Sequence, residues 1–232
     1  MLSIVIPAWN EEKYLPILLE CINQQAYKDY EIIVADAAST DNTPKIARRY
    51  GCKIVKGGMP AVGRNNGAKA AKGEILLFLD ADVQFDENFI MKSIDEFKRR
   101  KLDVAGVYIT PSSRKIIDKI YLGIFNCCIF VTQLFYSSAF GGGIFCKKWL
   151  HKKVSGFDDT IILGEDTDYV RRCAKFGKFR IMNNVKIYFS MRRFDKEGRI
   201  KLGFRYLLAT LYSLSFSKIR TDLFKYNMKY KR

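Results

Sequence analysis

The chain has 232 residues, of which 48% are hydrophobic, and a formal net charge of +16 at pH 7. This length fits one domain with a sizeable core better than two, and the hydrophobic content excludes a disordered chain. So large a positive excess predicts an anionic partner, which could be nucleic acid, an anionic membrane or an anionic substrate.

The cysteines and the single histidine limit the possible metal chemistry. The six cysteines include no Cys-x-x-Cys pair, and His151 is the only histidine. A zinc site would therefore lack its usual ligands. We interpret the cysteines as free thiols in a reducing cytosol. We expect no signal peptide, because residues 1–7 are too short for its apolar region and no basic segment precedes them.

Strands and helices alternate through the first half of the chain. Strands are predicted at residues 2–6, 31–35, 53–55, 75–79 and 104–109, and helices at residues 15–22, around 46–47, at 63–72 and at 88–97. This alternation is typical of an α/β fold with a parallel sheet flanked by helices. Right-handed crossovers then leave an open, Rossmann-like sheet as the expected topology.

Acidic residues follow three of these strands. Glu11 comes after the first strand, Asp36 after the second, and Asp80 and Asp82 after the fourth. Parallel strands end at one edge of a sheet, where such folds bind ligands, so these carboxylates should meet in one crevice. A lone Asp-x-Asp also fits a solvated turn. Several carboxylates together need a positive partner, and Mg²⁺ carrying a diphosphate would supply one.

Two common phosphate-binding motifs are absent from the sequence. No Gly-x-Gly-x-x-Gly follows the first strand, and no Gly-x-x-x-x-Gly-Lys-Ser/Thr occurs. Both motifs bring backbone N–H groups to phosphates. Here the phosphates would be held through a metal, which favours a nucleotide-diphosphate donor over a dinucleotide.

The alternation stops after residue 110, and residues 120–146 carry no charge. Their length could suggest a membrane span. However, acidic motifs lie on both sides of the segment, and one active site cannot straddle a bilayer. We therefore predict a core helix or a helix lying at a membrane interface. A strand is expected at residues 144–146, and the three glycines before it would let a ligand approach the backbone.

A second acidic group, Glu165 with Asp166 and Asp168, begins a predicted helix. A favourable helix dipole would explain these charges without any catalytic role.

In this order and spacing, the motifs resemble those of family 2 glycosyltransferases with the GT-A fold, over roughly residues 2–193. The resemblance is carried by Pro7-Ala8-Trp9-Asn10-Glu11-Glu12, Asp36 with Ser39 and Asp41, Arg64-Asn65-Asn66-Gly67-Ala68, Asp80-Ala81-Asp82 and Gly164-Glu165-Asp166.

The resemblance implies a role for each motif. The nucleotide would be bound by Pro7, Trp9, Glu11, Asp36, Arg64 and Asp80, with Asp36 at the base and Asp80 at the ribose. Asp82 would bind Mg²⁺ or Mn²⁺. Gln84 extends the likeness to dolichyl-phosphate mannose synthases, in which a glutamine joins the metal shell. Asp166 would be the acceptor base of an inverting displacement, and Glu165 would orient the acceptor or Asp166.

The chain departs from the family pattern in two places. Ala37 and Ala38 stand where family members often have an aspartate and a glycine, so base recognition could differ. No histidine follows His151, although many members have a late histidine near the diphosphate. We predict that Arg192 and Arg193 help to hold the diphosphate; a solvated basic turn is the alternative.

The predicted organisation is a glycosyltransferase domain at residues 1–190, followed by a basic extension at residues 191–232. Residues 1–110 would form the nucleotide-binding half of the domain, and residues 111–190 the acceptor half. In the extension, basic residues flank the apolar residues 202–216 on both sides. This pattern favours an amphipathic helix lying on an anionic membrane, and a helix packed on the domain is the alternative.

The resemblance implies a metal-dependent glycosyltransferase, and the basic extension predicts that it is peripheral on the cytoplasmic face of the membrane. It would move a sugar from a nucleotide-diphosphate donor to a hydroxyl acceptor, a lipid or lipid-linked sugar. A polyprenyl-phosphate acceptor is the first alternative. A non-enzymatic protein that binds nucleic acid or anionic lipid would also explain the charge, but not the convergence of acidic residues. A sugar nucleotidyltransferase would be expected to carry a Gly-rich basic loop after the first strand, which this chain lacks.

Overall fold

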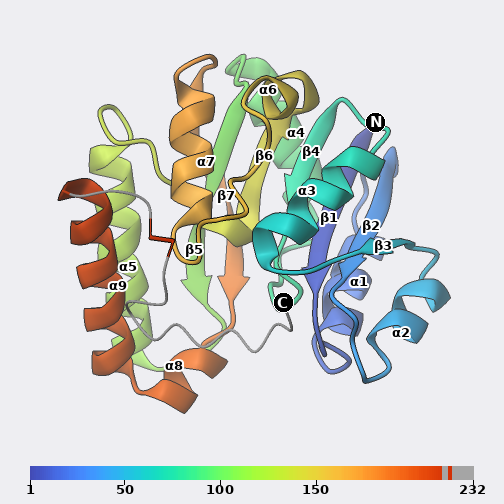
Figure 1. The fold of residues 1–232 in the computed structure, drawn as a ribbon, viewed down its shortest axis with the longest axis horizontal. Helices are drawn as coiled ribbons and strands as arrows, with labels where there is room; N and C mark the ends of the chain where they lie inside the picture. Colours follow the sequence, from blue (N-terminus) through green and yellow to red (C-terminus); the bar gives the residue numbers. More distant parts are fainter. Residues whose placement is uncertain (216–218, 221–232) are drawn as a thin grey trace.

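The computed structural model describes residues 1–215 and 219–220. Their seven strands form one sheet in the order β3-β2-β1-β4-β6-β5-β7 (Figure 1). Its strands are β1 (Leu2–Ala8), β2 (Tyr30–Asp36), β3 (Lys53–Lys56), β4 (Ile75–Phe78), β5 (Val104–Pro111), β6 (Ile144–Lys147) and β7 (Phe179–Phe189). β6 runs antiparallel to β4 and β5, and the other pairs are parallel. The predicted mostly parallel α/β sheet is confirmed.

Helices cover both faces of this sheet (Figure 1). They are α1 (Leu15–Asn23), α2 (Thr43–Arg49), α3 (Pro60–Ala70), α4 (Phe89–Arg99), α5 (Ile116–Thr132), α6 (Lys148–Lys153), α7 (Glu165–Ala174), α8 (Arg192–Glu197) and α9 (Arg199–Ser215), with a short 3₁₀ turn, η1 (Gly141–Gly143). The apolar side chains form two clusters, one with α1 and α4 and one with α3, α6 and α7. β1 contributes Ile4 and Ile6 to the first cluster and Val5 to the second, as alternation along a strand requires.

The central strand β4 is the buried strand that its unbroken apolar sequence predicts. Leu76, Leu77 and Phe78 are fully buried. β4 pairs with β1 on one side and β6 on the other, so Asp80 and Asp82 leave the sheet at its middle. This position directs both carboxylates into the crevice where the strands end.

The longest strand, β7, is absent from the sequence predictions. Its pairing with β5 shifts between Val107 and Tyr108, so residues 183–185 of β7 bulge out of the ladder. The buried carboxylate of Glu96 accepts hydrogen bonds from the backbone N–H groups of Asn183 and Asn184, at 2.9 and 3.1 Å. The bulge interrupts the two-residue periodicity that would have indicated a strand.

Of the two alternatives predicted within residues 120–146, a core helix or a helix at a membrane interface, the structure contradicts the core helix. The helix α5 begins earlier, at Ile116, and buries only Asp118, Leu122 and Ile129. The Asn126 side chain fastens α5 to β5 through two hydrogen bonds with the backbone of Ile109, at 3.2 and 2.7 Å. Among the described residues, no helix combines the length and the apolar character needed to cross a membrane.

The helices α8 and α9, in the predicted extension, pack on the domain through one side. Met191, Phe194 and Leu202 are buried in the same cluster as α1 and α4. Ile200 and Phe204 point outward, 90% and 60% exposed. Apart from Ile219 and Arg220, the tail beyond Ser215 lies outside the described residues.

Candidate functional site

The loops after β1 and β2 hold one another at the carboxyl edge of the sheet. The backbone N–H of Asn10 donates to the hydroxyl of Ser39 at 2.9 Å, and that of Glu11 donates to Thr43 at 2.8 Å. In return, the Asn10 side chain accepts from the backbone of Thr40 at 2.8 Å. These contacts fix the position of Glu11 before any ligand binds.

Asp36, at the end of β2, has a buried oxygen that lacks a hydrogen-bond partner among the described residues. One carboxylate oxygen accepts from the backbone of Ser39 at 3.3 Å, whereas Oδ1 is buried and unsatisfied. A buried acceptor left unpaired is costly, and such an atom points to an absent donor. An N–H group of a nucleobase would satisfy it.

Ala38, which departs from the family pattern, has an unfavourable backbone conformation. Its φ is +58°, in the left-handed region that favours glycine. Ala38→Gly is therefore expected to raise the free energy of unfolding by about 1 kcal/mol. Chemical denaturation would measure the change, with Ala37→Gly as the matched control. No gain over that control would contradict the conformational explanation.

Arg64, on α3, lies at the centre of the crevice. Its side chain is 3% exposed and donates to Asp80 Oδ1 and to Glu165 Oε1, each at 2.8 Å. It also lies over the Phe157 ring, 5.4 Å from the ring centroid. Burial lowers the pKa of Arg64, but the charges of Asp80 and Glu165 outweigh that effect and raise it overall. Arg64 thus joins the two acidic motifs, which lie 85 positions apart in the sequence.

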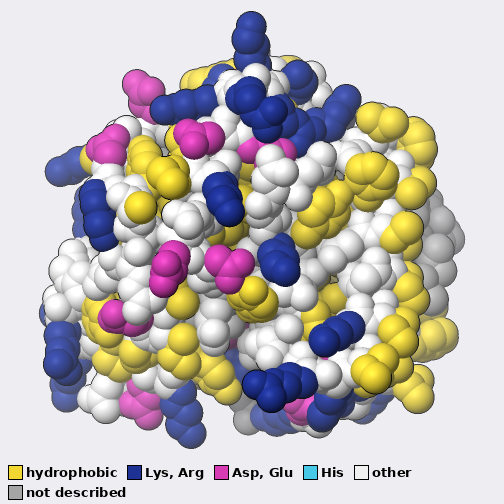
Figure 2. Space-filling model, turned by 180° about the vertical axis from the view of Figure 1, so that it is seen from behind, with side chains coloured by type: hydrophobic (Ala, Val, Ile, Leu, Met, Phe, Trp, Pro, Cys, Tyr) yellow, Lys and Arg dark blue, Asp and Glu magenta, His cyan; other side chains and the backbone are white. Residues whose placement is uncertain are grey.

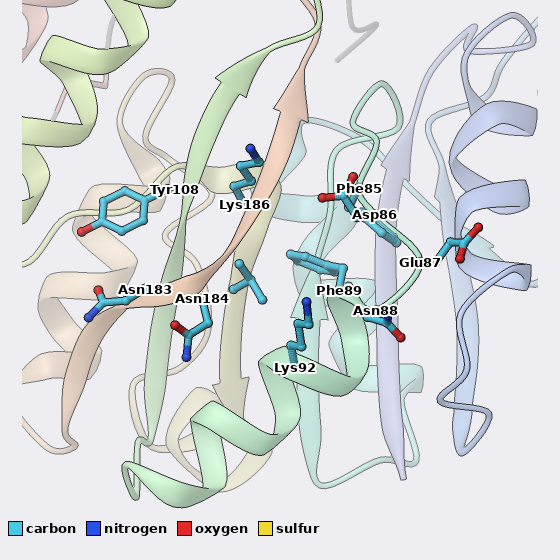
Figure 3. A pocket seen from close by; sticks show the side chains of 11 residues that line it. Phe85, Asp86, Glu87, Asn88, Phe89, Lys92, Tyr108, Asn183, Asn184 and Lys186 are labelled. Atoms are coloured by element: carbon cyan, nitrogen blue, oxygen red, sulfur yellow. The ribbon is translucent and has the colours of Figure 1, made fainter.

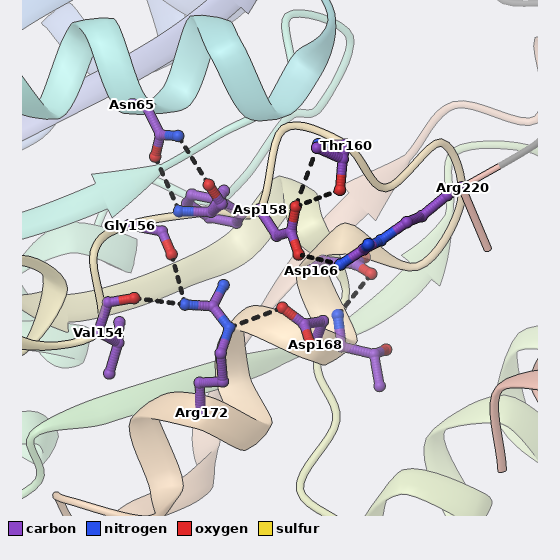
Figure 4. Close-up of polar contacts among 11 residues, drawn as sticks. Asn65, Val154, Gly156, Asp158, Thr160, Asp166, Asp168, Arg172 and Arg220 are labelled. Carbon is purple, nitrogen blue, oxygen red and sulfur yellow. Dashed lines mark hydrogen bonds and ion pairs between the residues drawn. The ribbon is translucent and has the colours of Figure 1, made fainter. Parts of the chain in front are cut away.

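The segment before α7 is braced by hydrogen bonds from Asn65 of α3 and from Arg172 of α7 (Figure 4). The Asn65 amide exchanges two hydrogen bonds of 2.8 Å with the backbone of Phe157. Arg172 donates to the Asp168 carboxylate at 2.7 Å and to the Gly156 carbonyl at 2.7 Å. α3 and α7 therefore both hold the loop that ends in the acidic motif.

Asp166 is held by the glycines of η1. Its Oδ2 accepts from the backbone N–H of Gly141 at 2.9 Å. A Cβ on Gly141 would lie 2.9 Å from Arg64 Nη2, and one on Gly142 would lie 2.9 Å from Asp80 Oδ2. Both positions therefore exclude a side chain. The predicted close approach at these glycines is made by the protein's own charged groups.

Burial raises the pKa of Asp166 to about 7, and the nearby charge of Glu165 adds to this rise. Arg64 opposes the shift. A carboxyl group with a pKa near neutrality can exchange protons under working conditions, as a general base must.

Asp82 lies at the other side of the crevice, against Arg192. The Arg192 guanidinium contacts Asp82 Oδ2 at 3.1 Å and forms a bidentate pair with Glu11, at 2.9 and 2.6 Å. It also stacks over Tyr14, 4.4 Å from the ring centroid. Burial raises the pKa of Asp82 to about 7 despite Arg192, and the charges of Asp80 and Glu11 contribute. The carboxylates around Asp82 therefore favour a further cation in addition to the Arg192 guanidinium.

The remaining predicted site residues are Pro7, Trp9, Gln84 and Arg193. Pro7 is buried near α3, where a Cβ on Gly63 would lie 3.1 Å from it. The backbone of Gln84 pairs with that of Tyr188 through bonds of 3.1 and 2.7 Å. Trp9 is half-buried. Arg193 contacts Glu197 at 2.8 Å within α8, so its guanidinium is held along that helix.

A hollow of about 670 Å³ lies outside this constellation (Figure 3). It is formed by the start of α4, by Tyr108 of β5 and by the bulge of β7, and its lining includes Lys92 and Lys186. None of the predicted site residues lines it. The predicted site residues therefore gather in the crevice around Arg64 and not at this hollow.

Comparison with known proteins identifies the family. The model of "Glycosyl transferase family 2" matches residues 3–140. The chain belongs to this family. The predicted family, and the prediction of a glycosyltransferase, are thereby confirmed.

Two curated relatives illustrate the range of this glycosyltransferase family. A 4,4'-diaponeurosporenoate glycosyltransferase of Staphylococcus haemolyticus is 37% identical over 40% of this chain and 27% of its own length. A dolichyl N-acetyl-alpha-D-glucosaminyl phosphate 3-beta-D-2,3-diacetamido-2,3-dideoxy-beta-D-glucuronosyltransferase of Methanococcus voltae is 26% identical over 80% of this chain and 65% of its own length. The chain thus covers less than two thirds of either relative.

Two solved structures share the fold of this glycosyltransferase. TarS of S. aureus, in complex with UDP-GlcNAc, has a TM-score of 0.69 at 18% identity, covering 98% of this chain and 76% of that one. The mannosyltransferase PcManGT of Pyrobaculum calidifontis, in complex with GDP-Man and Mn2+, has a TM-score of 0.72 at 18% identity, covering 92% and 63%. The predicted GT-A fold is confirmed.

Proposed function

We propose that this glycosyltransferase uses a divalent metal to transfer a sugar, with inversion, from a nucleotide-diphosphate donor to a hydroxyl group on a lipid or lipid-linked acceptor. The observation that carries the proposal is geometric: Arg64 joins the strand-end carboxylate Asp80 to Glu165 of the second acidic motif, so both motifs meet in one crevice. Asp82 lies on one side of this crevice and Asp166 on the other, with Arg64 and Asp80 between them.

The nucleotide would bind along the ends of β1 and β2. Asp36 Oδ1 offers a buried acceptor for a nucleobase N–H, and the fixed loop around Glu11 forms the neighbouring wall. Asp80 would face the ribose, next to Arg64. TarS and PcManGT were solved with nucleotide sugars, which supports such a donor here.

The residues around Asp82 fit Mg²⁺ or Mn²⁺. Carboxylate oxygens are the ligands that these hard ions prefer, and Gln84 would add an amide oxygen. Among the described residues, no three His, Cys, Asp or Glu side chains gather closely enough to hold a metal alone. This agrees with Mg²⁺, which takes one or two carboxylates and completes its shell with phosphate oxygens and water. When bound, the metal would neutralise charge on the departing diphosphate.

The acceptor would enter beside Asp166. The ionised carboxylate takes the proton of the acceptor hydroxyl as its oxygen forms a bond to the anomeric carbon. The bond from that carbon to the diphosphate breaks on the opposite side, so the configuration inverts. The Gly141 N–H holds Asp166 in place for this transfer, and the nearby charge of Arg64 favours the ionised carboxylate.

A hydroxyl acceptor fits this arrangement better than a polyprenyl phosphate. A phosphate is already ionised and needs no base, whereas a hydroxyl needs one. The name of the M. voltae relative describes transfer to a dolichyl-linked sugar phosphate, which supports a lipid-linked sugar as acceptor. A phosphate acceptor would instead leave transfer unchanged when Asp166 is replaced.

Arg192 pairs with Asp82 and Glu11 in this structure, so its replacement would test whether the metal binds at Asp82. Arg192→Met should strengthen Mn²⁺ binding in the absence of nucleotide by about tenfold, since a competing cation is removed. It should weaken donor binding in the presence of Mn²⁺, because a diphosphate contact is lost. Calorimetric titration would measure both affinities. Arg193→Met serves as the control, and parallel changes in the two affinities would contradict this assignment.

A thermal-shift panel of UDP-, GDP- and dTDP-sugars, with and without Mn²⁺, would test the proposed donor. A ligand that binds the folded state raises its melting temperature by mass action. We expect a metal-dependent rise with sugars of one nucleotide. If no sugar nucleotide changes the melting temperature, the proposed donor chemistry is wrong.

A further inference from the structure

The helix α5 and the turn after it expose a continuous apolar stripe. Ile117, Ile120, Ile124, Val131 and Phe135 recur at intervals of three, four, seven and four residues, and they are 55%, 54%, 61%, 55% and 80% exposed. Three- and four-residue intervals place side chains on one side of a helix. We call these five residues the α5 stripe. Contiguous exposed apolar surface on a folded protein is typical of interaction sites.

The neighbouring helix α9 continues this surface at the same edge of the molecule (Figure 1). Arg199 pairs with Asp118 at 2.6 Å, and a Cβ on Gly203 would lie 3.1 Å from the Tyr121 ring, so α9 packs along α5. Its outward residues Ile200 and Phe204 are spaced by one turn and are exposed. Figure 2 shows hydrophobic side chains gathered along this edge, at the right of the view.

The charges around the stripe are predominantly positive. Residues 112–135 and 191–215 carry nine basic and three acidic side chains. All three acidic groups are already paired: Asp118 and Asp195 contact Arg199, and Glu197 contacts Arg193 and Arg205. Lys119 and Lys201 are exposed near the ends of the apolar residues. An apolar stripe bordered by unneutralised cations matches an anionic lipid surface.

We propose that the α5 stripe docks the enzyme on an anionic bilayer, with the outward side of α9 beside it. A second copy of the chain would bring the same positive charge to the interface and be repelled, whereas anionic lipid headgroups complement it. The apolar side chains would enter the boundary between headgroups and acyl chains, as those of helices lying in the membrane plane do.

The docking position rests on the proposed lipid acceptor and locates its route to the active site. After α5, residues 133–140 lead directly to Gly141, whose N–H holds Asp166. Phe135 of the stripe therefore lies six positions before that glycine. A bilayer on α5 would lie beside the acceptor half of the crevice, where a lipid-borne hydroxyl must arrive.

Vesicle flotation would test the docking surface on the full chain. One set of vesicles would contain phosphatidylcholine alone, and the other equal parts of phosphatidylcholine and phosphatidylglycerol. We expect binding to the anionic vesicles and a fall of about a hundredfold in Ile120→Glu/Ile124→Glu, since burial of each isoleucine contributes roughly tenfold. Lys119→Gln/Lys201→Gln should reduce the preference for anionic vesicles. Ile124→Trp should show blue-shifted emission when vesicles are added.

Trp149→Glu/Phe176→Glu is the matched control, because it adds the same two negative charges at exposed side chains outside α5 and α9. Binding retained in Ile120→Glu/Ile124→Glu, or an equal loss in the control, would overturn the proposal. A second result would also overturn it: the parent chain forms a dimer that does not bind vesicles, and Ile120→Glu/Ile124→Glu dissociates this dimer. Donor binding with Mn²⁺, measured by thermal shift, is independent of the stripe. A loss of vesicle binding alone therefore leaves the proposed chemistry intact, and a failure of donor binding alone leaves the docking surface intact.

Discussion

Replacing Asp166 with asparagine is expected to slow sugar transfer severely while donor binding persists. Loss of a positioned general base typically costs roughly 10²- to 10⁴-fold in rate. The substituted amide would keep the shape of the side chain and could not accept the proton. The proposed donor site, around Asp82 and Asp36, does not include Asp166, so the metal-dependent thermal shift should be preserved. Initial rates of nucleoside diphosphate release with acceptor present would measure the effect.

The pH dependence of the parent enzyme should report the same carboxylate. Burial and Glu165 raise the pKa of Asp166 from its usual value to about 7, and only the ionised form accepts a proton. Transfer should therefore fall as the pH drops below about 7, where Asp166 becomes protonated. The residual activity of Asp166→Asn should not show this fall at low pH. A rate independent of pH between about 5 and 8 would contradict the assignment of this base.

The stability of this variant provides a check on folding. A carboxyl with a raised folded pKa contributes stability that is present below its unfolded pKa and is lost as the pH rises through its folded pKa. Relative to the parent, Asp166→Asn should therefore lose less stability at about pH 8 than at about pH 5. Glu165→Gln, which keeps the Gly141 contact of Asp166, is the matched control and should retain more transfer. Equal activity of Asp166→Asn and the parent would remove Asp166 as the base.

Replacing Asp82 with alanine should eliminate metal-dependent donor binding. With one of its few protein ligands lost, the metal would no longer be held against the diphosphate, and donor affinity in Mn²⁺ should fall by at least about a hundredfold. The fold should persist, because Arg192 keeps its bidentate pair with Glu11. Isothermal titration with the nucleotide sugar identified by thermal shift would measure the loss.

Asp86→Ala is the matched control for this substitution. Asp86 carries the same charge four positions later, but it contacts Tyr188 and lines the separate hollow rather than the crevice. Its replacement should leave donor affinity within about threefold of the parent, as surface changes usually do. If Asp86→Ala weakens donor binding as much as Asp82→Ala, the metal position is wrong.

The sheet could be predicted because its strands are short apolar runs that end at loops with distinct chemistry. β4 shows this most clearly, since its unbroken apolar residues can be buried on both faces and its following carboxylates must then lie at the sheet edge. The strand β7 escaped prediction because a bulge held by Glu96 breaks its alternation. The sequence left two alternatives open for α5, a core helix and a helix at a membrane interface, because an apolar helix has the same sequence pattern in a core and on an exterior surface.

The candidate site could be predicted as a set of residue types, but not as a set of pairs. The sequence placed acidic motifs at the strand ends and at the start of α7, and it assigned Arg64 to the nucleotide. It could not show that Arg64 is buried between Asp80 and Glu165, because that contact depends on how α7 packs against the sheet. The contact of Gly141 with Asp166 likewise depends on backbone position.

The contacts of Arg192 and Arg193, which lie in one turn of α8, also could not be predicted from the sequence. The two arginines are adjacent, and the sequence alone favours neither of them over the other as a ligand of the diphosphate. The direction of α8 sends Arg192 to Asp82 and Glu11, and Arg193 to Glu197. Only the orientation of the helix separates them, which is why their substitutions should have different effects on metal and donor binding.

Crystals grown with Mn²⁺ and the nucleotide sugar identified by thermal shift would test the central proposal most directly, through the anomalous signal of manganese. We predict a manganese peak bonded to the Asp82 carboxylate and to the donor diphosphate, with Arg192 moved from Asp82 onto the phosphates. A nucleotide sugar bound in the crevice without manganese at Asp82, or manganese bound elsewhere, would contradict the account.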